Sequence, residues 1–316
     1  MNMFLAVAGG VAGLVLLYLG ADGLVKGGGA IAVRLGVSPL IVGLTLVAFG
    51  TSAPELFVSV TAANQGLGDI CVGNAIGSNI CNVALVLGLS ALVAPLAVDP
   101  ALIRRDIPMM IATSVVFALM TFVFGGMGRI AGALFVGALI CYTALGIARS
   151  RCSAADRDKP EGVGMPLGIA VLVSVLGLAA LVVGAKFLLS CAVSIATGFG
   201  VSDERVALTV VAVGTSFPEL ATSIVAARDG ESEIAIGNLV GSNIFNILGV
   251  LGVSALVAPF ESKGVGTADY VMMVATSALV WFLAVNRRRF GKREGLLLLG
   301  LYAAYLVGRV AVGRFG

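Results

Sequence analysis

Long apolar runs separated by short polar breaks follow one another along the whole chain. Ten of these runs hold about 19 residues or more, close to the length that a helix needs to cross a bilayer. A more polar connector at 149–165 separates five runs in 1–148 from five in 166–316. The expected spans are 3–27, 38–63, 70–93, 103–124, 129–148, 166–196, 202–227, 233–257, 268–286 and 294–312.

The second half of the chain repeats part of the first half. Residues 36–95 align with 200–259 at a constant offset of 164 without a gap, and 35 of the 60 positions are identical. Because each half holds an odd number of spans, the second copy should lie upside down in the bilayer. We therefore expect an all-α membrane protein with ten transmembrane helices in two inverted five-helix repeats.

Composition excludes a soluble domain. The chain is 59% hydrophobic and only 12% charged, with a mean hydropathy of +1.07, whereas a soluble protein needs charged residues to cover its surface. A multi-pass protein surrounded by lipid is expected. The formal net charge of +3 gives no sign of a nucleic-acid partner, and the absence of histidine removes the commonest proton relay. The five cysteines show no metal-ligand spacing and read as small buried hydrophobic residues.

Positive charges are unevenly distributed between the connectors. With the N-terminus outside, 14 of the 20 Lys and Arg residues fall on the cytoplasmic side and 6 on the outer side. Positive residues concentrate in cytoplasmic loops. Both termini are therefore expected outside, the 149–165 connector in the cytoplasm, and the protein in the plasma (cell inner) membrane.

One carboxylate lies within an apolar span of each copy: Glu55 in the first and Glu219 in the second. An ionisable group at this depth costs roughly 2.5–3.5 kcal/mol on insertion scales, so it indicates a functional site. The alternative, an ion pair with a buried basic residue, finds no Lys or Arg within the neighbouring spans except near their ends. Pro54 and its equivalent Pro218 should kink or break these helices and leave carbonyl oxygens facing a cavity.

Further oxygen donors share helical faces with the carboxylates. Ser78 and Asn82 are four residues apart in the next span, and Ser242 and Asn246 repeat the arrangement. Carboxylate, amide, hydroxyl and carbonyl oxygens are the ligands that hard cations such as calcium prefer, and no soft ligand accompanies them. Taken singly, such hydroxyls often bond back to their own helix. Two carboxylates balance one divalent ion, which predicts one cation site built from both halves.

These paired motifs resemble the two alpha-repeats of the cation/calcium exchanger superfamily, and most of all those of prokaryotic sodium/calcium exchangers. The resemblance rests on Gly50–Glu55 with Gly77–Asn82 and on Gly214–Glu219 with Gly241–Asn246. It implies calcium ligands at Glu55 and Glu219, and carbonyl oxygens at the turns of Thr51 and Thr215. It implies sodium ligands at Thr51, Ser52, Ser78, Asn82, Thr215, Ser216, Ser242 and Asn246.

The resemblance implies a sodium/calcium antiporter that works by alternating access, functions as a monomer, transports calcium and sodium and has no resident cofactor. Asn246 stands where potassium-dependent members carry aspartate, which favours potassium independence. The alternatives are a proton- or potassium-linked antiporter and a passive cation channel. Gly66-Leu67-Gly68-Asp69 matches the short signature of intramembrane aspartyl proteases, but a second buried aspartate is missing, so no enzyme is expected.

The long, glycine-rich first and sixth spans are the expected moving part. The run Lys26–Gly29 is expected to supply slack near one end of the first span.

Overall fold

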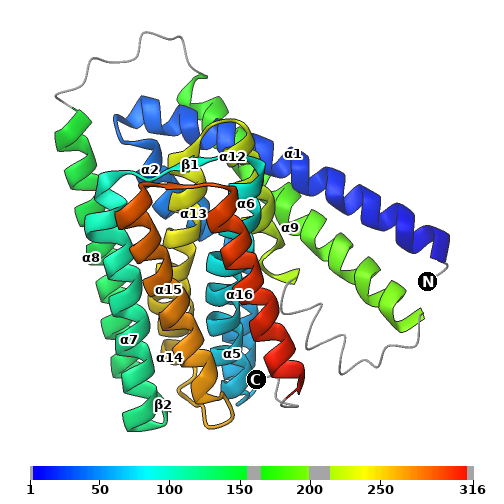
Figure 1. The fold of residues 1–316 in the computed structure, drawn as a ribbon, viewed down its shortest axis with the longest axis vertical. Helices are drawn as coiled ribbons and strands as arrows, with labels where there is room; N and C mark the ends of the chain where they lie inside the picture. The colour runs from blue at the N-terminus through cyan, green and yellow to red at the C-terminus, as the bar shows by residue number, and fades with distance from the viewer. Residues whose placement is uncertain (1–2, 155–164, 199–213, 312–316) are drawn as a thin grey trace.

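The computed structural model describes residues 3–154, 165–198 and 214–311, and these residues are almost entirely helical (Figure 1). Several helices contain π-helical turns, labelled η. In chain order the elements are α1 (Met3–Leu35), α2 (Pro39–Val42), η1 (Gly43–Val47), α3 (Ala48–Thr51), α4 (Ala53–Asn64), α5 (Gly68–Ile80), η2 (Cys81–Val86), α6 (Leu87–Val93), β1 (Leu96–Ala97), η3 (Leu102–Asp106), α7 (Ile107–Phe124), β2 (Gly126–Met127), α8 (Arg129–Ala154), α9 (Leu167–Gly198), α12 (Phe217–Arg228), α13 (Ser232–Phe245), η5 (Asn246–Leu251), α14 (Gly252–Val257), β3 (Phe260–Glu261), α15 (Thr267–Arg287), β4 (Arg289–Phe290) and α16 (Lys292–Ala311).

The apolar helices confirm an integral, multi-pass membrane protein. Within the described ranges, seven helices are long and apolar enough to cross a membrane, or up to eight if the bent pair Pro39–Thr51 and Ala53–Asn64 counts as one span. Residues 202–213 of the expected span 202–227 lie outside the described residues, and the rest of the span is seen, with α12 beginning at Phe217. The connector 149–165 is also only partly described: α8 runs into it as far as Ala154.

The first helix is longer than the sequence suggests. The expected span ends at residue 27, but α1 continues as helix to Leu35, through the run of glycines that follows Lys26. The reason is tertiary packing: a Cβ on Gly27 would clash with Ser174 Oγ and lie 2.8 Å from the carbonyl oxygen of Ala170. The neighbouring helix α9 thus needs a residue without a side chain there. The run is helical and its first glycine is tightly packed, and the expectation of slack at this run stays a prediction.

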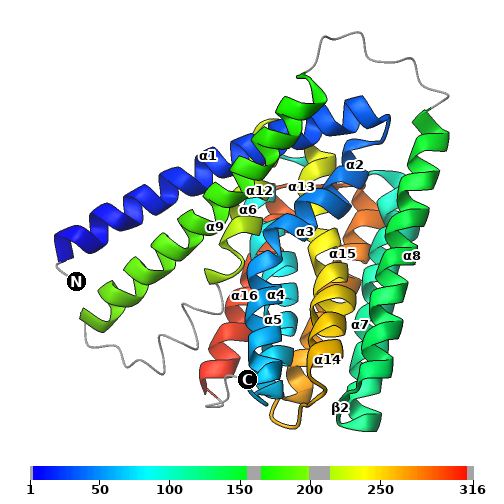
Figure 2. The ribbon, with the colours of Figure 1, turned by 180° about the vertical axis from the view of Figure 1, so that it is seen from behind.

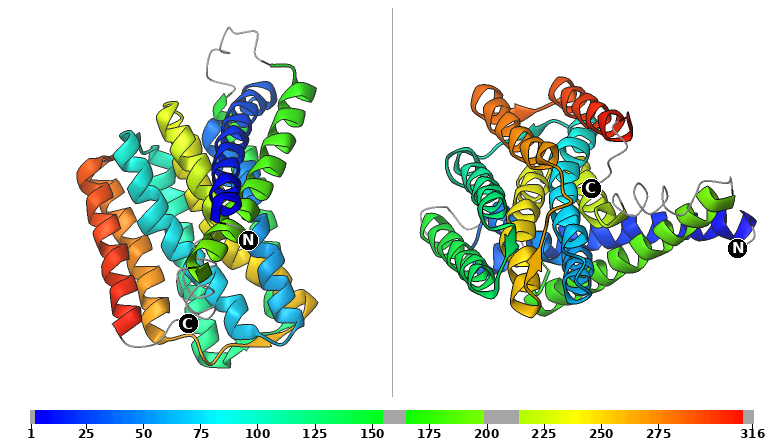
Figure 3. Two further views of the ribbon diagram at one scale, coloured as in Figure 1. Left: turned by 90° about the vertical axis from the view of Figure 1, so that its right-hand side faces the viewer. Right: turned by 90° about the horizontal axis from the view of Figure 1, so that it is seen from below.

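Helices α1 and α9 form an antiparallel pair that projects from one side of the other helices (Figure 3). Glycines spaced seven residues apart line the contact: Gly13 meets Gly184, and Gly20 meets Gly177. At each of these positions an added Cβ would come within about 3 Å of backbone atoms of the partner helix. Small residues at a membrane helix interface let two backbones approach closely, so this pair is held by backbone packing along its length.

Two short antiparallel strand pairs lie at opposite ends of the bundle. β1 pairs with β4 through Leu96 and Phe290, and β2 pairs with β3 through Met127 and Phe260. Figure 1 shows β1 at the upper end and β2 at the lower end. Strand β1 directly follows the first sequence copy, and β3 directly follows the second. Each pairs with a strand from the other half of the chain, so the two halves are joined at both ends of the bundle.

The helices that carry the candidate residues are the most deeply buried. The membrane-length window of Ser232–Val257 is 83% buried and that of Gly68–Val93 is 72% buried, compared with 11% for Arg129–Arg151. Figure 2 shows α3 beside α13 and α4 beside α5, with α8 at the edge of the bundle. A span with polar residues inside it is stable only when those residues face protein or a cavity. The polar spans therefore form the centre, and helix α8, whose charged residues lie only near its ends, lies at the periphery.

Candidate functional site

All ten candidate residues are buried in the centre of the protein. Their exposed fractions run from 0% for Glu55 and Glu219 to 8% for Thr215. The complete set is Thr51, Ser52, Glu55, Ser78, Asn82, Thr215, Ser216, Glu219, Ser242 and Asn246. The structure thus brings residues from both sequence copies into one polar core.

A break in each copy places a glutamate at the beginning of a helix. Helix α3 ends before Ser52, and α4 starts again with Pro54 in its first turn at an angle of 48° to the preceding segment. Ser52 has φ −84° and ψ 9°, and Ser216, before α12, has φ −84° and ψ 6°. The predicted break is confirmed before Glu55, and Ser216 has the same turn geometry before Glu219, where most of the preceding segment lies outside the described residues. Glu55 and Glu219 lie in the first turns of α4 and α12, where the helix dipole stabilises a negative charge.

Hydrogen bonds connect the carboxylates to hydroxyls from both copies. Ser78 Oγ donates to Glu55 Oε1 at 3.4 Å, and Ser242 Oγ donates to Glu219 Oε1 at 3.4 Å. The shortest of these contacts joins the two halves: Ser52 Oγ donates to Glu219 Oε1 at 2.8 Å. The break in the first copy therefore lies directly against the carboxylate of the second copy.

Neither carboxylate has a basic partner in the part of the chain that the structure describes. The ion pairs found there lie elsewhere, such as Arg105–Asp106 and Arg309–Asp269. The second oxygens, Glu55 Oε2 and Glu219 Oε2, are buried without a hydrogen bond. A buried charge without a partner is strongly destabilising. The sequence alternative of an ion pair with a buried Lys or Arg thus finds no support among the described residues, and a bound cation would supply the missing partner.

Neutral oxygens accompany the two carboxylates. Within the described ranges, no group of three His, Cys, Asp or Glu side chains is arranged to hold a metal ion. Any cation shell here must therefore be completed by neutral donors, and four such oxygens from candidate residues are buried without a hydrogen bond. Oxygens of this kind suit hard cations such as calcium and sodium. The four atoms are Asn82 Oδ1, Asn246 Oδ1, Thr215 Oγ1 and Ser216 Oγ.

The two asparagines of the candidate set lie at the starts of π-helical turns. Asn246 is the first residue of η5, and Asn82 is the second residue of η2. A π turn inserts one residue into the helical ladder and leaves a backbone carbonyl without its usual donor, and such turns often occur at functional sites. The irregular backbone here is buried in protein, as membrane depth requires.

Two asparagines that support the site were not assigned from the sequence. Asn74 Nδ2 donates to the carbonyl of Glu55 at 3.2 Å and to Ser59 Oγ at 2.9 Å. Asn238 Nδ2 makes the equivalent bonds, to the carbonyl of Glu219 at 3.4 Å and to Ser223 Oγ at 3.0 Å. The signal was present in the repeat, since an asparagine stands at both positions. These bonds hold each glutamate-bearing helix against the next helix.

Other sequence features have structural roles. Asp69, from the protease-like signature, accepts a hydrogen bond from the backbone of Gly264 at 2.9 Å in an exposed loop, away from the carboxylates. Cys71, Cys81 and Cys191 are buried and free, as expected, whereas the free Cys141 is exposed on α8. The side chain of Cys152 lies outside the described side chains.

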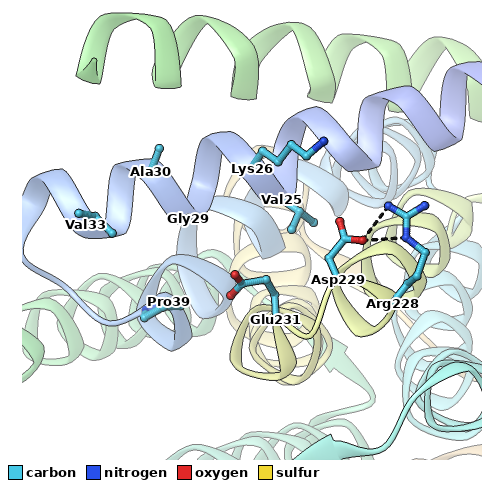
Figure 4. A pocket seen from close by; sticks show the side chains of 9 residues that line it. All are labelled: Val25, Lys26, Gly29, Ala30, Val33, Pro39, Arg228, Asp229 and Glu231. Carbon is cyan, nitrogen blue, oxygen red and sulfur yellow. Dashed lines mark hydrogen bonds and ion pairs between the residues drawn. The ribbon is translucent and has the colours of Figure 1, made fainter. Parts of the chain in front are cut away.

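A surface cavity of about 680 Å³ lies between α1, the start of α2 and the α12–α13 turn (Figure 4). Lys26, Pro39, Arg228, Asp229 and Glu231 contribute to its lining. It contains none of the ten candidate residues.

Comparisons with known proteins agree with this geometry. The sodium/calcium exchanger protein family matches residues 5–148 and 169–311, and the chain belongs to this family. Sodium/calcium exchanger MaX1 of Methanosarcina acetivorans is 34% identical, covering 93% of this chain and 95% of the relative. Inner membrane protein YrbG of Escherichia coli is 36% identical, covering 96% of each chain. A solved structure of the sodium-calcium exchanger NCX_Mj matches with a TM-score of 0.84 and 32% identity, covering 96% of this chain and 98% of the other.

Family membership confirms the broad class predicted from the sequence. The chain is a multi-pass membrane transporter of the cation/calcium exchange class, and its family moves sodium and calcium ions. It is not an enzyme, since the members of this family are transporters.

Proposed function

We propose that this chain is a sodium/calcium antiporter that couples calcium transport to a sodium gradient by alternating access. The observation that carries the proposal is the pair of buried carboxylates, Glu55 and Glu219, which lack a basic partner among the described residues and lie among unpartnered neutral oxygens. The names of MaX1 and NCX_Mj, both sodium/calcium exchangers, support the same pair of ions.

Charge balance explains how one site can couple two fluxes. Two carboxylates neutralise one calcium ion or two sodium ions, so either load leaves the buried site without net charge. Because calcium and sodium use the same carboxylate oxygens, they compete for the site. A site that has released one ion must bind the other before the protein can turn the site toward the opposite face of the membrane. An empty site would carry two buried negative charges, which opposes the conformational change.

The ten candidate residues have different parts in this proposal. Glu55 and Glu219 hold calcium, together with the backbone oxygens at the turns of Thr51 and Thr215. The remaining oxygens complete the sodium sites. This second set consists of Ser52, Ser78, Asn82, Ser216, Ser242 and Asn246, with the Thr51 and Thr215 hydroxyls.

The proposed architecture is ten spans in two inverted halves, 1–148 and 166–316, joined by the connector 149–165. Three observations support it. Helices α1 and α9, which occupy equivalent places in the two halves, run antiparallel. The strand pairs β1–β4 and β2–β3 lie at opposite ends of the bundle. The Tyr142–Asp106 hydrogen bond of 2.9 Å has a counterpart in Tyr305–Asp269 at 2.8 Å, outside the region of clear sequence identity.

Access to the buried site requires a moving element, and the α1–α9 pair is the proposed one. The candidate residues lie in the central helices, whereas this pair projects beside them (Figure 3). The glycine contacts between α1 and α9 hold the two helices together, so the pair can slide as a unit over the centre. The same site is then exposed alternately at the two membrane faces, in a single chain acting as a monomer.

The end of the bundle that carries β4 is proposed to face the cytoplasm, with both termini outside. Lys292 and the arginines around β4 lie at this end, whereas Lys263 follows β3 at the other end. The name of the inner membrane relative supports a plasma-membrane location. In a background without native cysteines, Lys263→Cys should react with an impermeant thiol reagent on intact cells and Lys292→Cys should not. The opposite labelling pattern would reverse the orientation.

The proposed activity is tested with purified protein in sealed liposomes. Calcium-45 uptake is measured under outward gradients of sodium, potassium or protons, compared side by side at fixed membrane potential. Uptake should require the sodium gradient. Uptake driven by protons or potassium would establish one of the alternative antiporters, and uptake without any counter-ion would indicate a channel.

A further inference from the structure

Four buried asparagines lie where the two halves of the polar core meet. Asn79, Asn82, Asn243 and Asn246 each have an exposed fraction of 1% or less. The proposed function uses only Asn82 and Asn246, as sodium ligands. Asn79 and Asn243 occupy equivalent positions one helical turn earlier, and they have no assigned role.

The hydrogen bonds of Asn79 and Asn243 are reciprocal. Asn79 Nδ2 donates to the backbone carbonyl of Asn243 at 3.2 Å, and Asn243 Nδ2 donates to the backbone carbonyl of Asn79 at 3.2 Å. A carbonyl oxygen can only accept a hydrogen bond. Each of these amides must therefore turn its nitrogen toward the opposite backbone, and the usual ambiguity between amide nitrogen and oxygen is removed.

This arrangement determines the orientation of the two ligand amides. The Oδ1 atom of Asn79 faces Asn246 and accepts from its Nδ2 at 3.0 Å. In the same way, Asn243 Oδ1 accepts from Asn82 Nδ2 at 3.1 Å. If Asn246 were flipped, two amide oxygens would face each other, and a buried donor would lose its partner. The nitrogen of each ligand amide is thus held by the other half of the chain.

The unpartnered atoms follow from this network. With their nitrogens engaged, Asn82 and Asn246 leave their Oδ1 atoms buried without a hydrogen bond. An oxygen atom attracts a cation, whereas an amide NH₂ group repels one. The same asparagine side chain, flipped, would present the wrong group to sodium.

We propose that Asn79 and Asn243 are positioning residues that orient the Asn246 and Asn82 amides so that the transported cation meets oxygen. The action is crossed: a residue of the first copy orients a ligand of the second copy, and the reverse. This inference rests on the proposed function, because it assumes that Asn82 and Asn246 bind the coupling cation. It differs from a packing role, which would act on neighbouring residues of the same helix.

Double-mutant cycles distinguish the crossed arrangement from a local one. The single variants Asn79→Ala, Asn243→Ala, Asn82→Ala and Asn246→Ala are combined in pairs, and the sodium KM and kcat of exchange are measured in liposomes. Residues in one hydrogen-bond network couple by factors of roughly 2 to 150. We expect the sodium KM to rise about tenfold in Asn79→Ala. In an Asn246→Ala background the same change should have almost no further effect. Asn243→Ala should likewise raise the sodium KM in the wild type and have almost no further effect in an Asn82→Ala background.

The matched controls are the pairs within one helix. Asn79 with Asn82, and Asn243 with Asn246, should give additive effects on the sodium KM, although they are nearest in sequence. Coupling within a helix and additivity across the halves would overturn the inference. An increase in KM with kcat little changed is expected. A decrease in kcat with an unchanged sodium KM, in Asn79→Ala or Asn243→Ala, would also contradict the positioning role.

Poor folding and failure of the proposed function give different results. If Asn79→Ala does not accumulate in the membrane, Asn79→Leu replaces it, because leucine keeps the branching at Cγ without the hydrogen-bonding groups. Size-exclusion chromatography checks each purified variant. The wild type is first tested for sodium-driven uptake of calcium-45. If it fails there, the proposed function is wrong. If it succeeds and the crossed coupling is absent, only the positioning role is wrong.

Discussion

The two sequence copies have the same residues at the helix breaks, but these residues have different partners. In the first copy, Thr51 Oγ1 donates to Asn238 Oδ1 at 3.1 Å, and Ser52 Oγ donates to Glu219 at 2.8 Å. In the second copy, the hydroxyls of Thr215 and Ser216 have no hydrogen-bond partner among the described residues. One sequence motif therefore occupies two environments within one molecule.

The difference lies in the hydrogen bonds, since Thr51 and Ser52 match Thr215 and Ser216 in residue type. Identical side chains on related backbones, with φ near −84° at both Ser52 and Ser216, can form or lose these hydrogen bonds. If the halves exchange environments during transport, as alternating access by inverted repeats requires, the present structure is one of two states.

The largest effect is expected from the carboxylates, where the two halves should be equal. Glu55→Gln or Glu219→Gln leaves one negative charge for a divalent ion, and each change should reduce calcium exchange at least about a hundredfold, as for removal of one member of a buried charge pair. Calcium-45 uptake in liposomes measures the loss. Glu261→Gln, at a carboxylate that is 74% exposed, is the matched control and should retain activity. Normal sodium-driven uptake in either buried variant would refute the shared site.

Serine variants should break the comparison between the two halves. Ser52→Ala removes the hydrogen bond to Glu219, whereas Ser216→Ala removes a hydroxyl that has no such bond in this state. Each should raise the sodium KM by roughly three- to tenfold, in line with the net contribution of about 0.5–1.5 kcal/mol from one polar interaction. The effects should fall on opposite membrane faces, as measured in inside-out and right-side-out vesicles. Equal effects on one face would show that the asymmetry has no part in access.

Asn246→Asp tests whether a third carboxylate changes the coupling ion. In the native protein Asn246 Nδ2 donates to Asn79 Oδ1. An aspartate at position 246 would instead place a carboxylate oxygen, which can only accept, next to Asn79 Oδ1. A proton or a cation would relieve this contact. Sodium/calcium exchange should be independent of potassium in the native protein and should become dependent on pH or potassium in the variant, by a few-fold. Asn82→Asp is the counterpart in the first half.

Two outcomes would contradict this prediction. Native exchange that stops when potassium is removed would show potassium coupling. An Asn246→Asp variant that matches the wild type across pH and potassium concentration would remove Asn246 from the ion pathway. A different response of Asn82→Asp would show that the two amide positions are chemically unequal.

The smallest expected effect lies at the surface, where the halves differ in sequence. Arg228 donates to the Tyr18 hydroxyl at 2.6 Å and lies 3.7 Å from Asp22, which ties the α12–α13 turn to α1 beside the cavity of Figure 4. Its equivalent in the first copy is Asn64. Exposed ion pairs contribute at most about 1 kcal/mol. Arg228→Gln should therefore change turnover only about twofold, and Asn64→Gln, the matched control, should leave it unchanged.

Much of the fold could be predicted from the sequence because membrane insertion imposes simple rules. Apolar length predicts spans, and the described helices follow most of the expected boundaries within a few residues. Helix α1 is the exception, since its continuation to Leu35 depends on contacts with α9 that hydropathy does not record. The repeat at an offset of 164 identified the polar spans, and proline chemistry predicted the breaks before Glu55 and Glu219.

The sequence by itself determined which atoms are available: two carboxylates, their hydroxyl and amide neighbours, and prolines that open the helices. Only the tertiary structure decided which of those atoms are engaged and which are left over. Helical spacing gives the face of a side chain, but not its partner on another helix 160 residues away. The crossed amide bonds of Asn79 and Asn243, and the unequal environments of Ser52 and Ser216, arise where the two halves meet, so no local pattern could contain them.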